Sequence, residues 1–163
     1  MNNNFTLNIH DGFMSHALAL ARRGMGKVSP NPMVGCVLVK EGEIIGEGFH
    51  EEFGGPHAEV MAIRNSRKDP ADSTAYINLE PCCITGKTPP CTQVLIQNGI
   101  SEVFVGILDP NPEINGKGIE NLKNAGILVH VGILEEESFK LNQSFNKWIT
   151  TGLPRVIAKV AQS

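Results

Sequence analysis

Residues 34–49, VGCVLVKEGEIIGEGF, decide the predicted fold because they describe two strands joined by a tight turn. Residues 34–39 are almost entirely apolar, as is typical of a buried strand. Residues 40–43, KEGE, supply a plausible hairpin turn, and residues 44–49 would return beside the first strand. The first two strands of the chain are therefore expected to be antiparallel neighbours in one sheet.

The sequence on either side of this hairpin alternates between helix and strand patterns. Before it, residues 11–24 repeat apolar side chains at helical spacing and end at a glycine. After it, the patterns predict helices at 57–66, 91–99, 118–125 and 135–148, and strands at 74–79, 102–108 and 127–131. Strands separated by helices predict an α/β fold, and the antiparallel hairpin makes its central sheet mixed.

Length and composition limit the class of protein. The 163 residues are 41% hydrophobic, enough to bury a core without disulfide bonds. A net charge of −3 gives no sign of a nucleic-acid surface, and the apolar runs are too short to span a membrane. The first residues, MNNNFTLNIHDGF, lack the features of a signal peptide. We therefore expect a cytoplasmic protein, in which cysteine-rich loops more often hold metal or do chemistry than form disulfides.

Residues 80–91, EPCCITGKTPPC, hold three of the chain's four cysteines. At first sight the run Gly86-Lys87-Thr88 suggests a Walker A phosphate loop, which needs another glycine five residues before Gly86. Pro81 stands at that position, and it offers no backbone N–H and cannot make the first bend of the loop. A nucleotide-phosphate site of this type is therefore disfavoured.

Three potential metal ligands are expected to converge. Cys82 directly follows an expected strand, whereas His57 and Cys91 each lie in the first turn of an expected helix. One histidine and two cysteines suit a catalytic zinc that keeps its fourth position for water. Glu59 could reach that open position without binding the metal. Cys83 could in principle close the site as a fourth, structural ligand, but adjacent residues rarely both reach one ion.

The order His-x-Glu, then Pro-Cys and a second Cys, is that of zinc deaminases. Around it the chain reads SPNPMVGCVLV, IIGEGFH, GGPHAEV, LEPC, GKTPPC and ILDPNP. With these motifs, the sequence from about Phe13 to its end resembles the deaminase domain of the bacterial bifunctional riboflavin-biosynthesis deaminase/reductase. The resemblance implies a three-layer α/β/α cytidine deaminase-like fold and a Zn²⁺ cofactor.

The resemblance also implies roles for single residues. His57, Cys82 and Cys91 match the zinc ligands of the family, and Glu59 matches its proton shuttle. The positions that match substrate contacts are Asn31, His50, Lys87, Thr88, Asp109 and Asn111. Lys87 is the expected partner of a 5′-phosphate, since its ammonium is a point charge on a flexible stem.

These substrate contacts also have a simpler interpretation. Judged by sequence pattern alone, His50 would be a histidine on the surface at the end of a strand. Asn31, Asp109 and Asn111 could be no more than turn residues. One stretch departs from the family, since Cys83-Ile84-Thr85 replaces its usual Ser-His-His or Ser-His-Tyr. Loss of these polar groups could weaken substrate binding or mark a changed substrate.

The reaction implied is hydrolytic deamination of 2,5-diamino-6-ribosylamino-4(3H)-pyrimidinone 5′-phosphate to 5-amino-6-(5-phosphoribosylamino)uracil and ammonia. Two alternatives stay open, namely a deaminase of another aminopyrimidine or nucleoside, and a non-catalytic domain stabilised by zinc. In the bacterial family an NADPH-dependent reductase follows the deaminase. We expect residues 1–150 to form the deaminase domain, and residues 151–163 to lead to a missing reductase or to be a C-terminal tail. The reductase would otherwise be a separate partner.

Self-association is a further expectation, because the family usually forms oligomers. Apolar residues near the C-terminus could supply the interface of a homo-oligomer or could belong to the core. These residues are Phe139, Leu141, Phe145 and Trp148. We expect most of them to be core, since they recur at helical spacing.

Overall fold

The computed structural model of the protein describes residues 3–85 and 89–160, with side-chain surroundings from residue 9 onward. A single five-stranded sheet has the order β2-β1-β3-β4-β5. Its strands are β1 (Gly35–Lys40), β2 (Glu43–Phe49), β3 (Thr74–Leu79), β4 (Glu102–Ile107) and β5 (Leu128–Val131). β1 runs antiparallel to both β2 and β3, while β3, β4 and β5 are parallel. The sheet is therefore mixed, as predicted.

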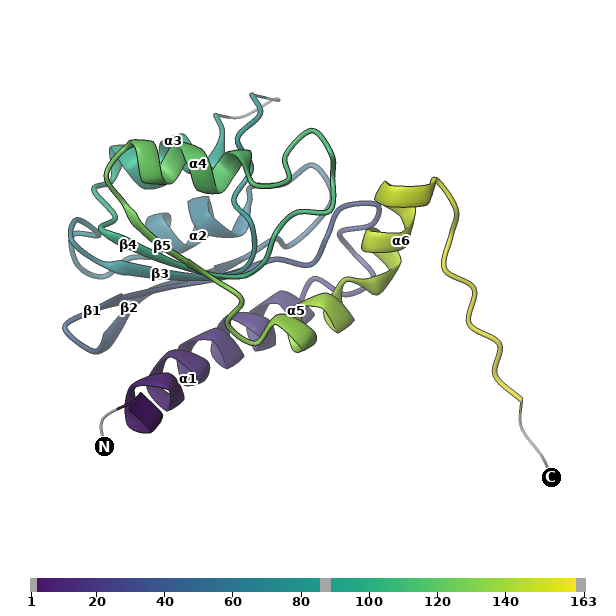
Figure 1. Ribbon diagram of the computed structural model, residues 1–163, viewed down its shortest axis with the longest axis horizontal. Coiled ribbons are helices and arrows are strands. Elements are labelled where there is room, and N and C mark those ends of the chain that lie inside the picture. The colour runs from purple at the N-terminus through teal and green to yellow at the C-terminus, as the bar shows by residue number, and fades with distance from the viewer. Residues whose placement is uncertain (1–2, 86–88, 161–163) are drawn as a thin grey trace.

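Helices cover both faces of this sheet, and Figure 1 shows the three layers. One face carries α1 (Asn3–Arg22) and α5 (Glu135–Leu141). The opposite face carries α2 (Ala58–Arg64), α3 (Cys91–Gln97) and α4 (Lys117–Asn124). The last helix, α6 (Gln143–Thr151), continues past the end of α5. The predicted α/β/α architecture is confirmed.

The opening hairpin forms as its sequence predicts. Glu41 and Gly42 occupy the turn between β1 and β2 with φ of 54° and 80°. Positive φ at both central positions is the geometry of the turns that match the twist of paired strands. Successive residues of β1 then alternate between two apolar clusters, with Cys36 in the cluster under α2 to α4 and Val37 in the cluster under α1. Because helices cover both faces, β1 reads as a continuous apolar run.

Glycines in β2 let α2 lie close to the sheet. A Cβ atom placed on Gly48 would approach the backbone nitrogen of Ala62 to 2.3 Å and the carbonyl oxygen of Ala58 to 2.4 Å. No side chain fits there, so glycine is required by the close packing of helix on strand. This packing sets the position of the N-terminus of α2, where His57 stands as the N-cap residue.

The predicted helix over residues 135–148 is wrong in one respect, because the structure divides it into α5 and α6 at Asn142. The buried Asn142 side chain binds the backbone of Met33: the Met33 N–H donates to Oδ1 at 2.8 Å, and Nδ2 donates to the Met33 carbonyl at 2.9 Å. This tertiary contact holds Asn142 at φ −105° and ψ 21°, outside helical geometry.

The expectation that the C-terminal apolar residues are mostly core is also wrong. Phe139 is 52% exposed and Trp148 is 48% exposed. Leu141 and Phe145 are only partly buried. The break at Asn142 turns α6 away from the sheet, so residues on α6 cannot share the core face of α5. Beyond α6, no helix or strand occurs in residues 153–160. Within the described residues, no helix is both long enough and apolar enough to cross a membrane.

Candidate active site

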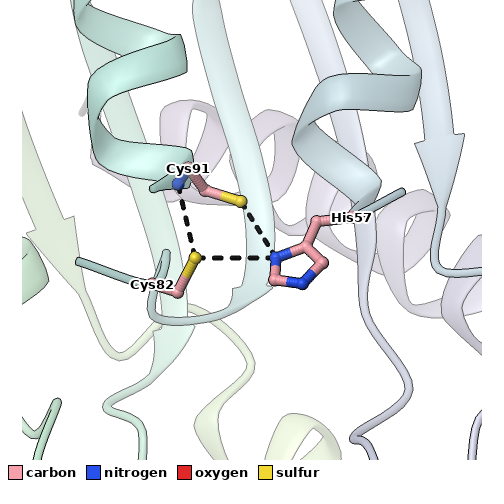
Figure 2. Close-up of side chains that lie close together, drawn as sticks. All are labelled: His57, Cys82 and Cys91. Carbon is pink, nitrogen blue, oxygen red and sulfur yellow. Dashed lines mark hydrogen bonds between the residues drawn. The ribbon is translucent and has the colours of Figure 1, made fainter. Parts of the chain in front are cut away.

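His57, Cys82 and Cys91 meet where α2, α3 and the end of β3 come together (Figure 2). The His57 Nδ1 atom lies 3.1 Å from Cys91 Sγ and 3.5 Å from Cys82 Sγ. The backbone N–H of Cys91 donates to Cys82 Sγ at 3.3 Å. The three donor atoms all lie within 4.8 Å of one another. The convergence expected from the positions of these residues in the chain is present in the structure.

This arrangement fits a tetrahedral metal site with three protein ligands. With Zn–N near 2.0 Å and Zn–S near 2.3 Å, the nitrogen and a sulfur of one tetrahedron stand about 3.5 Å apart. The separation of His57 Nδ1 from Cys82 Sγ, 3.5 Å, equals this value, and that from Cys91 Sγ, 3.1 Å, is somewhat shorter. Cys83 does not belong to the group of potential ligands found among the described residues. The donor set is therefore that of an open site, with a position left for a water molecule.

The thiol groups of Cys82 and Cys91 have pKa values that are shifted in opposite directions. A hydrogen bond from the Cys91 thiol is the largest influence on Cys82 and, with the hydrogen bond to His57, lowers the pKa of Cys82 to about 4. The pKa of Cys91 is raised, because its thiol donates to Cys82 and is buried. One thiolate thus forms before any cation binds. A cation is the natural partner of that charge, since metal ligation requires thiolates.

Glu59 stands in the first turn of α2, two residues beyond His57, and is only 3% exposed. Burial raises its pKa, and the negative charge of Cys82 raises it further. A carboxyl group with a raised pKa can both accept and return a proton near neutral pH. Such a group beside a set of metal ligands is a candidate for catalytic proton transfer.

A cavity of about 270 Å³ opens in front of these residues. His57, Glu59 and Cys82 are among the residues that line it. The predicted substrate contacts that also line it are Asn31, His50, Asp109 and Asn111. The fold therefore brings together four of the six predicted contacts. The other two, Lys87 and Thr88, lie outside the described residues, and their role stays a prediction.

His50 is buried at the end of β2, so it is not a surface residue. Its Nδ1 atom lies 3.0 Å from the carbonyl oxygen of Pro56, and its Nε2 atom lies 3.1 Å from Asn31 Nδ2. A carbonyl only accepts, so Nδ1 carries the proton, and Nε2 accepts from the Asn31 amide. Burial lowers the pKa of His50, which keeps the imidazole neutral. The pair is thereby held in one orientation at the cavity wall.

Asp109 and Asn111 combine a turn with a place in the cavity. Asp109 Oδ1 accepts from the N–H of Asn111 at 2.8 Å, and Asn111 Oδ1 accepts from the N–H of Glu113 at 3.0 Å. These are side-chain turns of the kind that asparagine and aspartate favour. Burial, more than the charges of Glu80 and Cys82, raises the pKa of Asp109 to about 6. The turn interpretation of these residues is therefore confirmed, and their contact with a substrate stays a prediction.

The structure adds residues that the sequence patterns did not select. Phe145 and Ile149 of α6 form an apolar side of the cavity, although Phe145 had been expected in the core or at an interface. Glu80 also lines the cavity. Its acidic side chain at the end of a buried strand was a usable signal, whereas nothing in the sequence indicated which face of α6 would meet the cavity. The unusual Cys83-Ile84-Thr85 segment does not line this cavity.

Known proteins share both the sequence and this fold. A profile for the cytidine and deoxycytidylate deaminase zinc-binding region matches residues 7–107. The diaminohydroxyphosphoribosylamino-pyrimidine deaminase of Buchnera aphidicola is 46% identical over 142 residues, which are 87% of this chain and 97% of that protein. The chain belongs to the zinc deaminase family, in its riboflavin-biosynthesis branch.

Longer relatives are similar to this chain over only part of their length. The riboflavin biosynthesis protein RibD of Aquifex aeolicus is 49% identical over 155 residues, which are 95% of this chain and 44% of that protein. The crystal structure of the diaminohydroxyphosphoribosylaminopyrimidine deaminase/5-amino-6-(5-phosphoribosylamino)uracil reductase of Thermotoga maritima has a TM-score of 0.87 and 48% identity. It covers 90% of this chain, which in turn covers 43% of that structure. The chain thus spans less than half the length of these two relatives.

Proposed function

We propose that the protein removes an amino group hydrolytically from 2,5-diamino-6-ribosylamino-4(3H)-pyrimidinone 5′-phosphate. The products would be 5-amino-6-(5-phosphoribosylamino)uracil and ammonia. The observation that carries this proposal is the buried Glu59 carboxyl beside the His57, Cys82 and Cys91 ligand set, in a cavity with polar groups on its walls. The names of relatives that this chain matches at 46% to 49% identity support the substrate.

In this proposal His57, Cys82 and Cys91 hold Zn²⁺, which when bound activates water by lowering its pKa toward about 7. Glu59 takes a proton from the attacking water, because its pKa is raised and its carboxyl group faces the cavity. It gives that proton to a ring nitrogen as the water oxygen bonds to the ring carbon, and then moves the remaining proton of the new C–OH group to the amine, which leaves as ammonia when the C–N bond breaks. A carbonyl oxygen replaces the amine on the ring carbon, so atoms and charge balance.

Four further side chains would bind and orient the pyrimidine. The neutral His50 and the Asn31 amide hold each other at one wall of the cavity. Asp109 and Asn111 also line the cavity. In each of them Oδ1 accepts a hydrogen bond from the backbone N–H two residues further on. The remaining oxygen of Asp109 and the amide nitrogen of Asn111 are not used by those turns, which leaves them for a ligand. Contact of Lys87 with the 5′-phosphate stays a prediction.

A non-catalytic metal domain explains the same residues less well. A structural zinc site is normally closed by four protein ligands, whereas the potential ligands among the described residues number three. Burial of a carboxyl group such as that of Glu59 is also costly in free energy, and a purely structural metal site does not need it. Deamination of another aminopyrimidine is a closer alternative, because the described part of the cavity does not include the predicted phosphate contacts.

Ammonia release from the diaminopyrimidinone phosphate by the zinc-loaded protein tests the proposal. We expect release that depends on the 5′-phosphate, so the dephosphorylated compound serves as the matched control substrate. Absence of release from folded, zinc-containing protein would contradict the proposed substrate. Other aminopyrimidines would then be tried in the same assay.

The product would be passed to an NADPH-dependent reductase. Whether that reductase is a separate partner or part of a longer chain stays a prediction, as does the assignment of residues 151–163. A homo-oligomer and a cytoplasmic location are likewise predictions. Gel filtration with light scattering would measure the oligomeric state directly.

A further inference from the structure

The carboxyl group of Glu80 is 3% exposed, yet it is fully occupied by backbone N–H groups. Oε2 accepts from Asp109 at 3.0 Å and from Gly116 at 2.9 Å. Oε1 accepts from Gly118 at 2.8 Å and from Ile119 at 3.3 Å. Within the described part of the chain, no cationic side chain forms an ion pair with Glu80. Peptide dipoles alone therefore replace the water that a carboxylate would otherwise bind.

These four bonds join segments that are far apart in the sequence. Glu80 directly follows the last residue of β3 and stands two residues before Cys82. Its donors belong to the loop after β4 and to the first residues of α4. The loop after β4 carries Asp109 and Asn111, both of which line the cavity. Glu80 thus connects the segment that carries Cys82 to the loop that carries Asp109 and Asn111.

Close packing at Gly118 shows that this connection needs a specific local sequence. A Cβ atom on Gly118 would approach the Pro81 carbonyl oxygen to 2.3 Å and Glu80 Oε1 to 3.0 Å. Only glycine lets the start of α4 come this near to the strand end. The contact therefore depends on both residues. Because Gly118 has no side chain, its backbone N–H can come close enough to donate to the Glu80 carboxylate.

We propose that Glu80 is a positioning residue for deamination, which holds Asp109 and Asn111 at a fixed place relative to the metal ligands. The proposal rests on the proposed function, since it concerns the same cavity. Glu80 binds the backbone N–H of Asp109, and the Asp109 side chain in turn binds the N–H of Asn111. Loss of the first bond would release the second residue as well. His57 and Glu59 depend on α2 instead, and their positions would change less.

Replacement of Glu80 should therefore affect substrate binding more than the chemical step. In Glu80→Ala we expect KM to rise about 10–100-fold, by analogy with the loss of activity when groups that orient metal ligands are removed, with a smaller fall in kcat. In Glu80→Gln the amide keeps one acceptor oxygen but turns N–H groups toward two of the donors. This variant should keep part of the contact and recover part of the lost KM.

A matched control separates positioning from a general loss of stability. Val103→Ala removes buried methyl groups from β4, away from the cavity, and should lower the thermal midpoint without changing KM. Hydrogen exchange of the zinc-loaded protein gives a second measurement that does not depend on activity. In Glu80→Ala the amides of Asp109, Gly116, Gly118 and Ile119 should exchange faster, whereas amides of β1 should not.

The outcomes are distinguishable. If Glu80→Ala loses stability as Val103→Ala does, but keeps the wild-type KM, the positioning role is wrong and Glu80 is only structural. Unchanged exchange at the four amides would overturn the proposal in the same way. If Glu80→Ala does not fold, the same two measurements on Glu80→Gln decide. If the wild type does not release ammonia, the proposed function fails, and the exchange pattern still decides whether Glu80 holds the loop.

Discussion

At the scale of single residues, Glu59 combines burial with a place two residues beyond His57, one of the three potential metal ligands. A carboxyl group in water would be ionised and of little use for returning a proton near neutral pH. Burial and the adjacent Cys82 thiolate raise the pKa of Glu59, so the same group can serve as base and then as acid. The metal ligands and the proton carrier are therefore parts of one electrostatic arrangement.

We expect Glu59→Gln to lose turnover while it keeps the metal. The amide has nearly the same shape but cannot take a proton from water, and general acid–base groups contribute about 10²–10⁴-fold to rate. Ammonia release and the zinc content of the purified variant are the two measurements. Wild-type activity in this variant would remove the assigned role. Loss of zinc would instead place Glu59 among the groups that hold the metal.

Asp109 predicts a pH dependence of stability. Its pKa is raised from 3.8 to about 6 in the folded protein, so between these values the folded state binds more protons than the unfolded state. The favourable contribution is therefore complete below pH 3.8 and is lost as pH rises through about 6. In Asp109→Asn, which stays neutral, we expect a gain of about 1–2 kcal/mol relative to wild type between pH 4 and 7, after allowance for solvent screening.

Urea unfolding of the metal-free proteins at pH 4 and pH 7 measures this effect. The asparagine variant keeps an oxygen for the turn with Asn111, so the comparison changes charge with little change in shape. A stability difference between the two proteins that is the same at both pH values would show that Asp109 does not titrate in this range.

At the scale of elements, the junction of α5 and α6 gives one wall of the cavity its orientation. Asn142 interrupts the helix and binds both backbone groups of Met33. Met33 follows the Asn31 turn, so one side chain links the end of α5 to the loop that carries a predicted substrate contact. The same interruption lets Phe145 face the cavity.

We expect Asn142→Ala to lower the free energy of unfolding by about 1–3 kcal/mol, because the partly buried N–H of Met33 loses its acceptor, while the Met33 carbonyl keeps only the hydrogen bond from Asn78. KM should also rise, since the Asn31 loop and α6 lose their connection. Asn98→Ala is a suitable control, because Asn98 only donates to Val94 within its own helix. Equal effects of the two substitutions would contradict a special role for the junction.

At the scale of the whole molecule, the core does not depend on the metal. Two apolar clusters occupy the two faces of the sheet. Every strand contributes residues to them, and no residue of α6 belongs to either cluster. The group of metal ligands lies at the rim of one layer, at helix starts and a strand end. A domain of this size can bury enough apolar surface to fold without a metal.

Removal of zinc with a chelator should therefore abolish activity and leave a folded protein. The far-UV circular dichroism spectrum should persist, while the thermal midpoint falls by several degrees because a ligand of the native state is lost. Activity should return when zinc is added back. Unfolding on chelation at 25 °C would instead indicate a structural metal site.

The sequence alone predicted the elements whose signals are local. The hairpin turn at residues 40–43, the strand at 74–79 and the mixed sheet all follow from apolar runs and turn residues. The start of α1 was predicted eight residues late, at Asp11. Asp11 is not a cap, because the helix passes through it, and the preceding residue is held by a tertiary contact in which His10 Nδ1 bonds the Tyr76 hydroxyl at 2.7 Å.

The sequence by itself determined which residues can do the chemistry. Once the chain is divided into alternating strands and helices, His57, Glu59 and Cys91 fall at helix starts, and Cys82 follows the end of a strand. Only the tertiary structure decided which groups meet them. The break at Asn142 and the four bonds to Glu80 join residues between 29 and 109 positions apart. Such contacts have no local signal, because they depend on how the layers pack rather than on any segment's own preference.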